Sequence, residues 1–145
     1  MTKSSAQALY DRVPHSGSMR LLDAVVRWSD TSILCETASH REPANPLRRD
    51  GRLSAAHAIE YGAQAAALHG VLCDDFENPR LLLAAARDVR LRCEHLEQLP
   101  APLSVTAQLQ MRAGGNAIYS FEVLADGEIV ASGRVTLVRS PAERR

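Results

Sequence analysis

The chain lacks an excess of charge of either sign. Seventeen Lys and Arg residues balance seventeen Asp and Glu residues in a total of 145. A balanced chain sets up no long-range field that would draw nucleic acid or an anionic membrane surface. We therefore expect neither as a partner, and an acidic partner would have to be met by a local group of basic residues.

The chain also lacks the motifs of several enzyme classes. It has no G-x-S-x-G elbow, no phosphate-binding glycine loop and no H-E-x-x-H pair, which argues against a serine hydrolase, a nucleotide-binding protein and a zincin. Its three cysteines, Cys35, Cys73 and Cys93, are odd in number and have no C-x-x-C spacing. They predict free thiols in a reducing compartment, for which the cytoplasm is the simplest choice. We expect no metal and no cofactor.

Long apolar runs are absent as well. No stretch is long and apolar enough to cross a membrane, and residues 1–12 contain no apolar core of a signal peptide. The length predicts a single domain, residues 1–145, that is large enough to bury a core.

The apolar residues that are present follow a pattern of strands around one helix. Alternating or β-rich segments are separated by turn signals such as Gly114-Gly115-Asn116 and Asp126-Gly127. This pattern predicts a short helix at 5–11, strands at 21–28, 32–39, 81–92, 103–112, 117–125 and 128–139, and a longer helix at 55–72. One helix with an antiparallel sheet is an α+β arrangement.

The helix predicted at 55–72 carries one carboxylate, Glu60, in unusual surroundings. Ser54 is a candidate N-cap, and the residues that follow are small or apolar around almost the whole circumference. Such a helix is normally buried. An ionised group in that setting finds a partner or shifts its pKa upward, as a general acid or base requires. Glu60 is therefore the first candidate for a functional residue.

Two segments resemble a known family. The helix segment AAHAIEYGAQAA is similar to the central helix of the 3-hydroxyacyl-acyl carrier protein dehydratases, approximately G-V-L-x-x-E-A-M-A-Q-A. The segment VPHSGSMRLLD at 13–23 resembles their N-terminal motif P-H-R-x-P-M-L-L-V-D. The loop NPLRRDGRL at 45–53 resembles the N-P-L/F-x-x-D-G-R-L loop of the predicted dehydratases of aryl polyene pigment clusters.

The resemblance covers about residues 13–139 and implies the hotdog fold, in which a long antiparallel sheet wraps one central helix. It implies that Glu60 is the catalytic acid of a lyase in a fatty acid or aryl polyene type pathway. It also implies an acyl thioester substrate, on acyl carrier protein or coenzyme A, and a homo- or hetero-oligomer with another hotdog subunit. The loop and the helix would supply the substrate-binding residues Asn45, Pro46, Arg49, Gly51 and Gln64, although Gln64 could instead satisfy a buried backbone group.

The chain departs from the family pattern at the catalytic histidine. The dehydratases place it in G-H-F-P-G, fourteen residues before the acid, where this chain has Pro46. The nearest upstream histidine, His40, is the candidate base if the loop follows a different path. His57, three residues before Glu60, is a second candidate for holding that carboxylate or replacing the base. His69 is expected at the surface.

Arginines gather in and beside the loop. These residues, Arg41, Arg48, Arg49 and Arg52, either line the entrance for a phosphopantetheine-linked acyl chain or belong to a solvated loop.

Three functions follow from these observations. The first is dehydration of a 3-hydroxyacyl thioester, with Glu60 as the acid and His40 or another group as the base. The second is a non-catalytic dehydratase-like subunit that pairs with an active homologue, which Pro46 favours. The third is an acyl-thioesterase, in which the helix carboxylate activates water.

Overall fold

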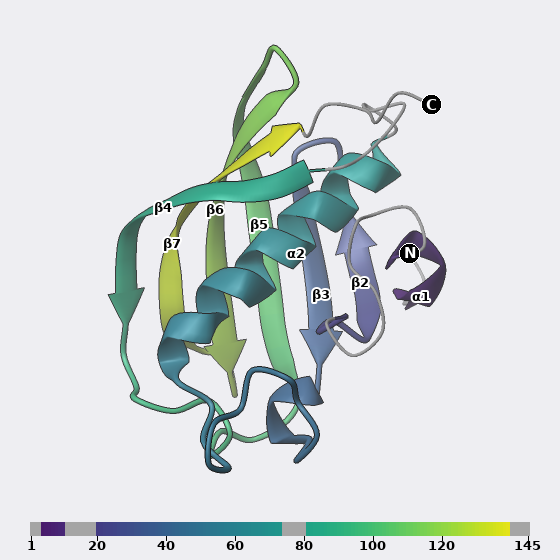
Figure 1. The fold of residues 1–145 in the computed structure, drawn as a ribbon. Coiled ribbons are helices and arrows are strands. Elements are labelled where there is room, and N and C mark those ends of the chain that lie inside the picture. Colours follow the sequence, from purple (N-terminus) through teal and green to yellow (C-terminus); the bar gives the residue numbers. More distant parts are fainter. Residues whose placement is uncertain (1–3, 11–19, 74–80, 140–145) are drawn as a thin grey trace, which may run out of the picture.

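The computed structural model describes residues 4–10, 20–73 and 81–139, and its main feature is a seven-stranded sheet (Figure 1). Every neighbouring pair of strands is antiparallel, in the order β1-β2-β3-β5-β6-β7-β4. The strands are β1 (Ser4–Ser5), β2 (Ala24–Trp28), β3 (Ser32–Thr37), β4 (Leu81–Leu91), β5 (Leu103–Ala113), β6 (Asn116–Ala125) and β7 (Glu128–Arg139).

One long helix, α2 (Ala58–Leu72), lies across one face of this sheet (Figure 1). A 3-10 turn, η3 (Ala55–His57), leads into it, and the Ser54 hydroxyl accepts a hydrogen bond from the Ala56 N–H at 3.2 Å. The predicted N-cap therefore caps the 3-10 turn rather than α2 itself. The other helical pieces in the described residues are α1 (Gln7–Tyr10) and η2 (Ser39–Arg41).

The core lies between α2 and the sheet. All residues from Tyr61 to Val71 are buried, as the small and apolar composition of the helix predicted. Gly62 allows the closest approach, because a Cβ atom built there would lie 2.4 Å from Cγ of Phe121 on β6. The small side chains of α2 therefore let the central strands pack directly against the helix backbone.

The sequence pattern predicted this architecture correctly. The structure confirms the α+β fold with one central helix, and the strands begin and end within about three residues of the predicted bounds. The two predicted turns are present, with Gly114, Gly115, Asp126 and Gly127 all at positive φ. The segment at 38–41 differs, because the strand predicted to reach Ser39 ends at Thr37 and η2 follows.

The two edges of the sheet differ in length. One edge is the two-residue strand β1, and the other is the eleven-residue strand β4. Figure 1 labels β4 at its edge of the sheet. None of the helices in the described part of the chain has the length and apolar character needed to cross a membrane.

Candidate functional site

Glu60 lies in the first turn of α2 and is partly buried. Its Oε1 accepts a hydrogen bond from Nε2 of Gln64, one helical turn further along, at 3.4 Å. The structure thus brings together the two residues that the helix motif singles out. The carboxyl group sits at the border of a helix whose next eleven residues are all buried.

The orientation of Gln64 follows from its other hydrogen bonds. Its side chain is fully buried, and Oε1 accepts from the Leu21 N–H at 2.9 Å and from the Tyr10 hydroxyl at 2.6 Å. The Tyr10 oxygen in turn accepts from the Leu22 N–H at 2.9 Å. Because a backbone N–H can only donate, the amide oxygen must face Leu21, and the amide nitrogen is left to face Glu60.

Burial also fixes the protonation of Tyr10. Removal from water raises the pKa of the Tyr10 hydroxyl far above its ordinary value, so this group remains a donor toward Gln64 at any physiological pH. The prediction that Gln64 could satisfy a buried backbone group is confirmed. The Gln64 side-chain amide thus accepts a hydrogen bond from the Leu21 N–H through its oxygen and donates one to Glu60 through its nitrogen.

A second polar cluster joins the loop at 38–53 to α2. The Tyr61 hydroxyl lies 2.8 Å from Ser39 Oγ and accepts from Asn45 Nδ2 at 3.1 Å. Asn45 Nδ2 also donates to the Ser39 carbonyl at 2.9 Å, and Asn45 Oδ1 accepts from the Leu47 N–H at 2.9 Å. Asn45 is buried, and its contacts hold the loop in shape beside the helix.

His40 is fully buried at the other side of this loop. Its Nε2 lies 3.0 Å from the Leu99 carbonyl oxygen, which can only accept, so Nε2 carries the proton. Nδ1 is buried without a hydrogen-bond partner in the part of the chain that the structure describes. Burial first, and then the positive charges of Arg41 and Arg48, lower the pKa of His40. The imidazole is therefore held neutral.

The structure does not bring His40 to Glu60. Within the described ranges, His40, His57 and His95 make no hydrogen bond to the Glu60 carboxyl group. His57 precedes α2 and forms no side-chain cap. The role of His40 as a base stays a prediction.

Most of the loop arginines are used within the protein. Arg48 donates to the carbonyls of Gly51 at 2.9 Å and His40 at 3.0 Å, and Arg41 donates to the Leu99 carbonyl at 3.0 Å. Gly51 adopts φ +76°, which a residue with a side chain rarely reaches.

Arg49 and Pro46 form the outward part of the loop. Both are exposed, and the Arg49 side chain makes no hydrogen bond or ion pair to any residue in the described ranges. Of the loop arginines, Arg49 is the one whose guanidinium is left to meet a phosphate or an acidic surface.

Glu97 anchors the end of the loop. Its Oε1 accepts from the Leu53 N–H and its Oε2 from Arg52 Nε, both at 2.8 Å. Desolvation acts against ionisation, but the Leu53 N–H and the Arg52 guanidinium outweigh it and lower the pKa of Glu97 to about 2. Arg52 is therefore engaged in this ion pair.

His69 lies in the core, which corrects the expectation that it is a surface residue. It is fully buried, with Nδ1 2.7 Å from the Tyr119 hydroxyl and Nε2 2.8 Å from the Ser29 carbonyl oxygen. Tyr119 also accepts from Arg112 Nη2 at 3.0 Å. The chain of polar contacts compensates for burying an imidazole among apolar residues.

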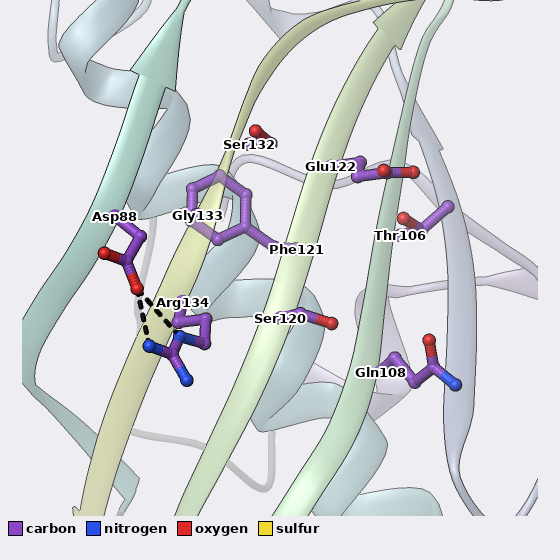
Figure 2. A pocket seen from close by; sticks show the side chains of 9 residues that line it. All are labelled: Asp88, Thr106, Gln108, Ser120, Phe121, Glu122, Ser132, Gly133 and Arg134. Atoms are coloured by element: carbon purple, nitrogen blue, oxygen red, sulfur yellow. Dashed lines mark hydrogen bonds and ion pairs between the residues drawn. The ribbon is translucent and has the colours of Figure 1, made fainter.

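A groove on the described surface lies away from Glu60. It has a volume of about 310 Å³ and lies on the sheet face opposite α2 (Figure 2). Its polar side chains point away from the helix, and Arg134 donates to Asp88 Oδ2 from Nε at 3.1 Å and from Nη2 at 2.5 Å. The lining residues are Asp88, Thr106, Gln108, Ser120, Phe121, Glu122, Ser132, Gly133 and Arg134. This groove does not contain Glu60.

Among the residues that the structure describes, no group of three or more His, Cys, Asp or Glu side chains is placed to hold a metal ion.

Two further residues of the site are Tyr10 and Tyr61, which no motif singles out. Tyr10 lies 54 residues from Gln64 along the chain, so their contact could not be found from the sequence. Tyr61 does carry a signal, because a buried tyrosine hydroxyl normally finds a hydrogen-bond partner.

Comparisons with solved structures show the hotdog fold. The dehydratase heterocomplex ApeI:P from Xenorhabdus doucetiae matches with a TM-score of 0.81 at 22% identity, over 92% of this chain and 91% of that chain. A thioesterase from Staphylococcus aureus matches with a TM-score of 0.59 at 12% identity, over 81% and 92%. AziG from S. sahachiroi matches with a TM-score of 0.58 at 16% identity, over 78% and 86%.

No curated protein matches the sequence of this chain. The model of the ApeP-like family, described as ApeP dehydratase, matches residues 7–144, which include α1, the loop, α2 and all strands from β2 to β7. The chain therefore belongs to the ApeP-like dehydratase family.

Proposed function

We propose that this chain is a dehydratase subunit that acts on 3-hydroxyacyl groups carried as thioesters by acyl carrier protein, with Glu60 as the general acid. The observation that carries the proposal is the Glu60 carboxyl group, partly buried on a helix of mostly small and apolar residues and hydrogen-bonded to Gln64. Membership of the ApeP-like dehydratase family supports the reaction class. The three thiols are free, which fits a reducing compartment, and we place the protein in the cytoplasm.

The reaction needs an acid and a base on either side of the substrate. A base removes a proton from C2, and the acid protonates the C3 hydroxyl as it leaves as water. Gln64 supports the acid role, because a donor held on Oε1 fixes the plane of the Glu60 carboxyl group before the substrate binds. Arg49 and Gly51 on the exposed part of the loop, together with Asn45 and Pro46, border the path of the thioester arm.

The base comes from another hotdog subunit in this proposal. Pro46 stands where the 3-hydroxyacyl-acyl carrier protein dehydratases have their histidine. His40 is buried, and its Nε2 is hydrogen-bonded to the Leu99 carbonyl and not to Glu60. Among the described strands β4 pairs with β7 alone, so its long outer edge offers a place for a second subunit. The similar protein from Xenorhabdus doucetiae is a dehydratase heterocomplex, which supports pairing with a different subunit.

A second candidate is a non-catalytic subunit that stabilises an active homologue or shapes its acyl tunnel. The same two observations favour it, namely Pro46 at the histidine position and the buried His40. In that case Glu60 is a structural residue, and its side chain serves to complete the Gln64 network.

The test is dehydration of a 3-hydroxyacyl-acyl carrier protein by the purified chain, alone and mixed with a histidine-containing hotdog subunit. Glu60→Gln keeps the shape but removes the titrating group, so the activity that depends on this chain should fall at least about a hundredfold. His40→Ala should leave activity within a few-fold, because the base is supplied by the partner.

Each alternative gives a different result. If the mixture stays fully active with Glu60→Gln, the catalytic role of Glu60 is wrong and the non-catalytic subunit is supported. A loss of activity in His40→Ala equal to that in Glu60→Gln, at unchanged stability, would place the base in this chain. Release of a free carboxylic acid instead of an enoyl thioester would identify a thioesterase.

A further inference from the structure

The surface that most needs an explanation is the free edge at β4. This strand is hydrogen-bonded to β7 on one side, while its other side ends the sheet (Figure 1). In an antiparallel pair the backbone groups of alternate residues bond to the neighbouring strand, so those of the other residues in this eleven-residue strand face its outer side. An edge of this length is a template for pairing with a second chain.

Apolar side chains on β4 are exposed on both faces of the strand. Leu82, Leu83 and Leu91 have 45%, 39% and 42% of their surface exposed in the chain. Leu82 and Leu83 are consecutive, so they point to opposite faces. A partner that extends the sheet would cover both of them.

Positive charge is concentrated on and just after the strand. Arg87, Arg90 and Arg92 are exposed, and they make no side-chain hydrogen bond or ion pair to any residue in the described part of the chain. The acidic residue of β4, Asp88, is bound by Arg134. The edge is therefore basic although the whole chain has a formal net charge of zero.

A second copy of this chain fits such an edge poorly. Antiparallel self-pairing about a two-fold axis sets the same strand of both copies side by side, so Arg87 and Arg90 of one copy would face an edge that carries the same two arginines. Like charges facing each other across strands are unfavourable. The register shift between Arg87 and Arg90, with Asp88 at φ +55°, further disturbs the edge for self-pairing.

From these observations we propose that the β4 edge selects a hotdog partner whose own edge strand carries carboxylates, in preference to a second copy of this chain. The proposal rests on the pairing suggested under the proposed function and specifies the chemistry of that partner. The leucines provide apolar burial with either partner. The arginines decide between the two, because opposite charges across an interface favour the right partner and like charges disfavour the wrong one.

The experiment uses a charge-reversed copy of this chain as the acidic partner. Wild type is mixed with Arg87→Glu/Arg90→Glu, and self-association and mixed association are measured by sedimentation at 50 and 500 mM salt. We expect the mixed pair to be at least about tenfold tighter than wild type with itself at 50 mM salt. Added salt should weaken the mixed pair and strengthen the self-pair, because it screens attraction in one and repulsion in the other.

Control variants separate the edge from charge in general. Arg27→Glu/Arg49→Glu reverses two exposed arginines outside β4 and should not pair with wild type more tightly than wild type pairs with itself. Arg87→Gln/Arg90→Gln removes the repulsion without adding a carboxylate and should strengthen self-association at low salt.

Two outcomes would overturn the proposal. One is equal affinity of the self-pair and the mixed pair, with both doubles folded by circular dichroism. The other is self-association of Arg87→Gln/Arg90→Gln that is no stronger than that of wild type. This second comparison decides the question even if Arg87→Glu/Arg90→Glu does not fold. Neither readout needs enzymatic activity, so a failed dehydration assay and a failed pairing test are separate results.

Discussion

Gln64 is held by more partners than its place in the helix motif suggests. Its amide oxygen accepts hydrogen bonds from the Leu21 N–H and the Tyr10 hydroxyl, and its amide nitrogen donates a hydrogen bond to Glu60. The result is that a segment far away in sequence fixes the side chain next to the candidate acid. A substitution at Tyr10 should therefore affect the stability of this network, because the Tyr10 hydroxyl is bonded to Gln64, which is bonded to Glu60.

We predict that Tyr10→Phe lowers the free energy of unfolding by about 1–3 kcal/mol, because it leaves the buried Leu22 N–H without its acceptor. Urea denaturation measures the change. A double-mutant cycle with Gln64→Met tests the connection and should show a coupling energy of about 0.5–3 kcal/mol. Strictly additive effects of the two substitutions would show that the Tyr10 to Gln64 bond does not contribute.

At this scale the sequence identifies residues but not their partners. Glu60 stands out because an isolated carboxylate in an alanine-rich helix is unusual, and the motif then points to Gln64. Tyr10, Leu21 and Leu99 could not be found, since hydrogen bonds over 54, 43 and 59 residues depend on how the loops pack. For His40 the sequence indicated a candidate base but not the Leu99 carbonyl that binds its Nε2.

The contact between α2 and β6 is an element-scale feature that depends on one missing side chain. Gly62→Ala places a methyl group 2.4 to 2.9 Å from three Phe121 carbons, including its Cβ. Because the Cβ atom is fixed by the backbone, rotation of the ring cannot relieve the whole clash. We predict a loss of about 1–3 kcal/mol in the free energy of unfolding, measured by urea denaturation. Phe121→Leu in the same background should recover part of it. If Gly62→Ala alone is neutral, the helix and the sheet do not pack this closely.

The loop at 49–53 is tied to the segment that follows β4 by Glu97, which gives the fold a pH dependence. The folded pKa of Glu97, about 2, lies below its ordinary value of 4.5, so its ionised form stabilises the folded state above pH 4.5. That stabilisation should be lost as the pH falls from 4.5 toward 2.

Thermal unfolding between pH 5 and pH 2 measures this effect. We expect Glu97→Gln to be less stable than wild type at pH 5, and the difference to shrink as the pH falls. Glu128→Gln, an exposed carboxylate at the start of β7, is the control and should track wild type. A constant difference between Glu97→Gln and wild type over the whole range would contradict the assignment.

Elements were predictable where periodicity is strong. The hairpins from β5 to β7 carry alternating β-rich residues and glycine turns, and their bounds came out within one residue. The end of β3 was not predictable. The Thr37 and Ser39 hydroxyls donate hydrogen bonds to the Leu21 carbonyl oxygen, at 2.5 and 2.6 Å, and the strand ends there. Competition of this kind between side chain and backbone leaves no trace in hydrophobic periodicity.

The whole molecule combines zero formal net charge with an apolar, basic free edge. Neither property can be deduced from the other, since the charge follows from counting residues and the edge follows from the strand order. The sequence predicted a sheet around a helix and a partner subunit by resemblance. The place of β4 at the edge became visible only with the topology.

This combination predicts how the isolated chain behaves in solution. Near pH 7, without a partner, the chain should self-associate increasingly with salt, because salt screens the β4 arginines while the apolar leucines stay exposed. Leu82→Thr/Leu83→Thr keeps residues that favour strands and should lower light scattering at 500 mM salt several-fold. Met111→Thr is the matched control, because Met111 is 57% exposed on β5, away from the β4 edge, and should scatter like wild type. Equal scattering of the leucine double and wild type would mean that association runs through another surface.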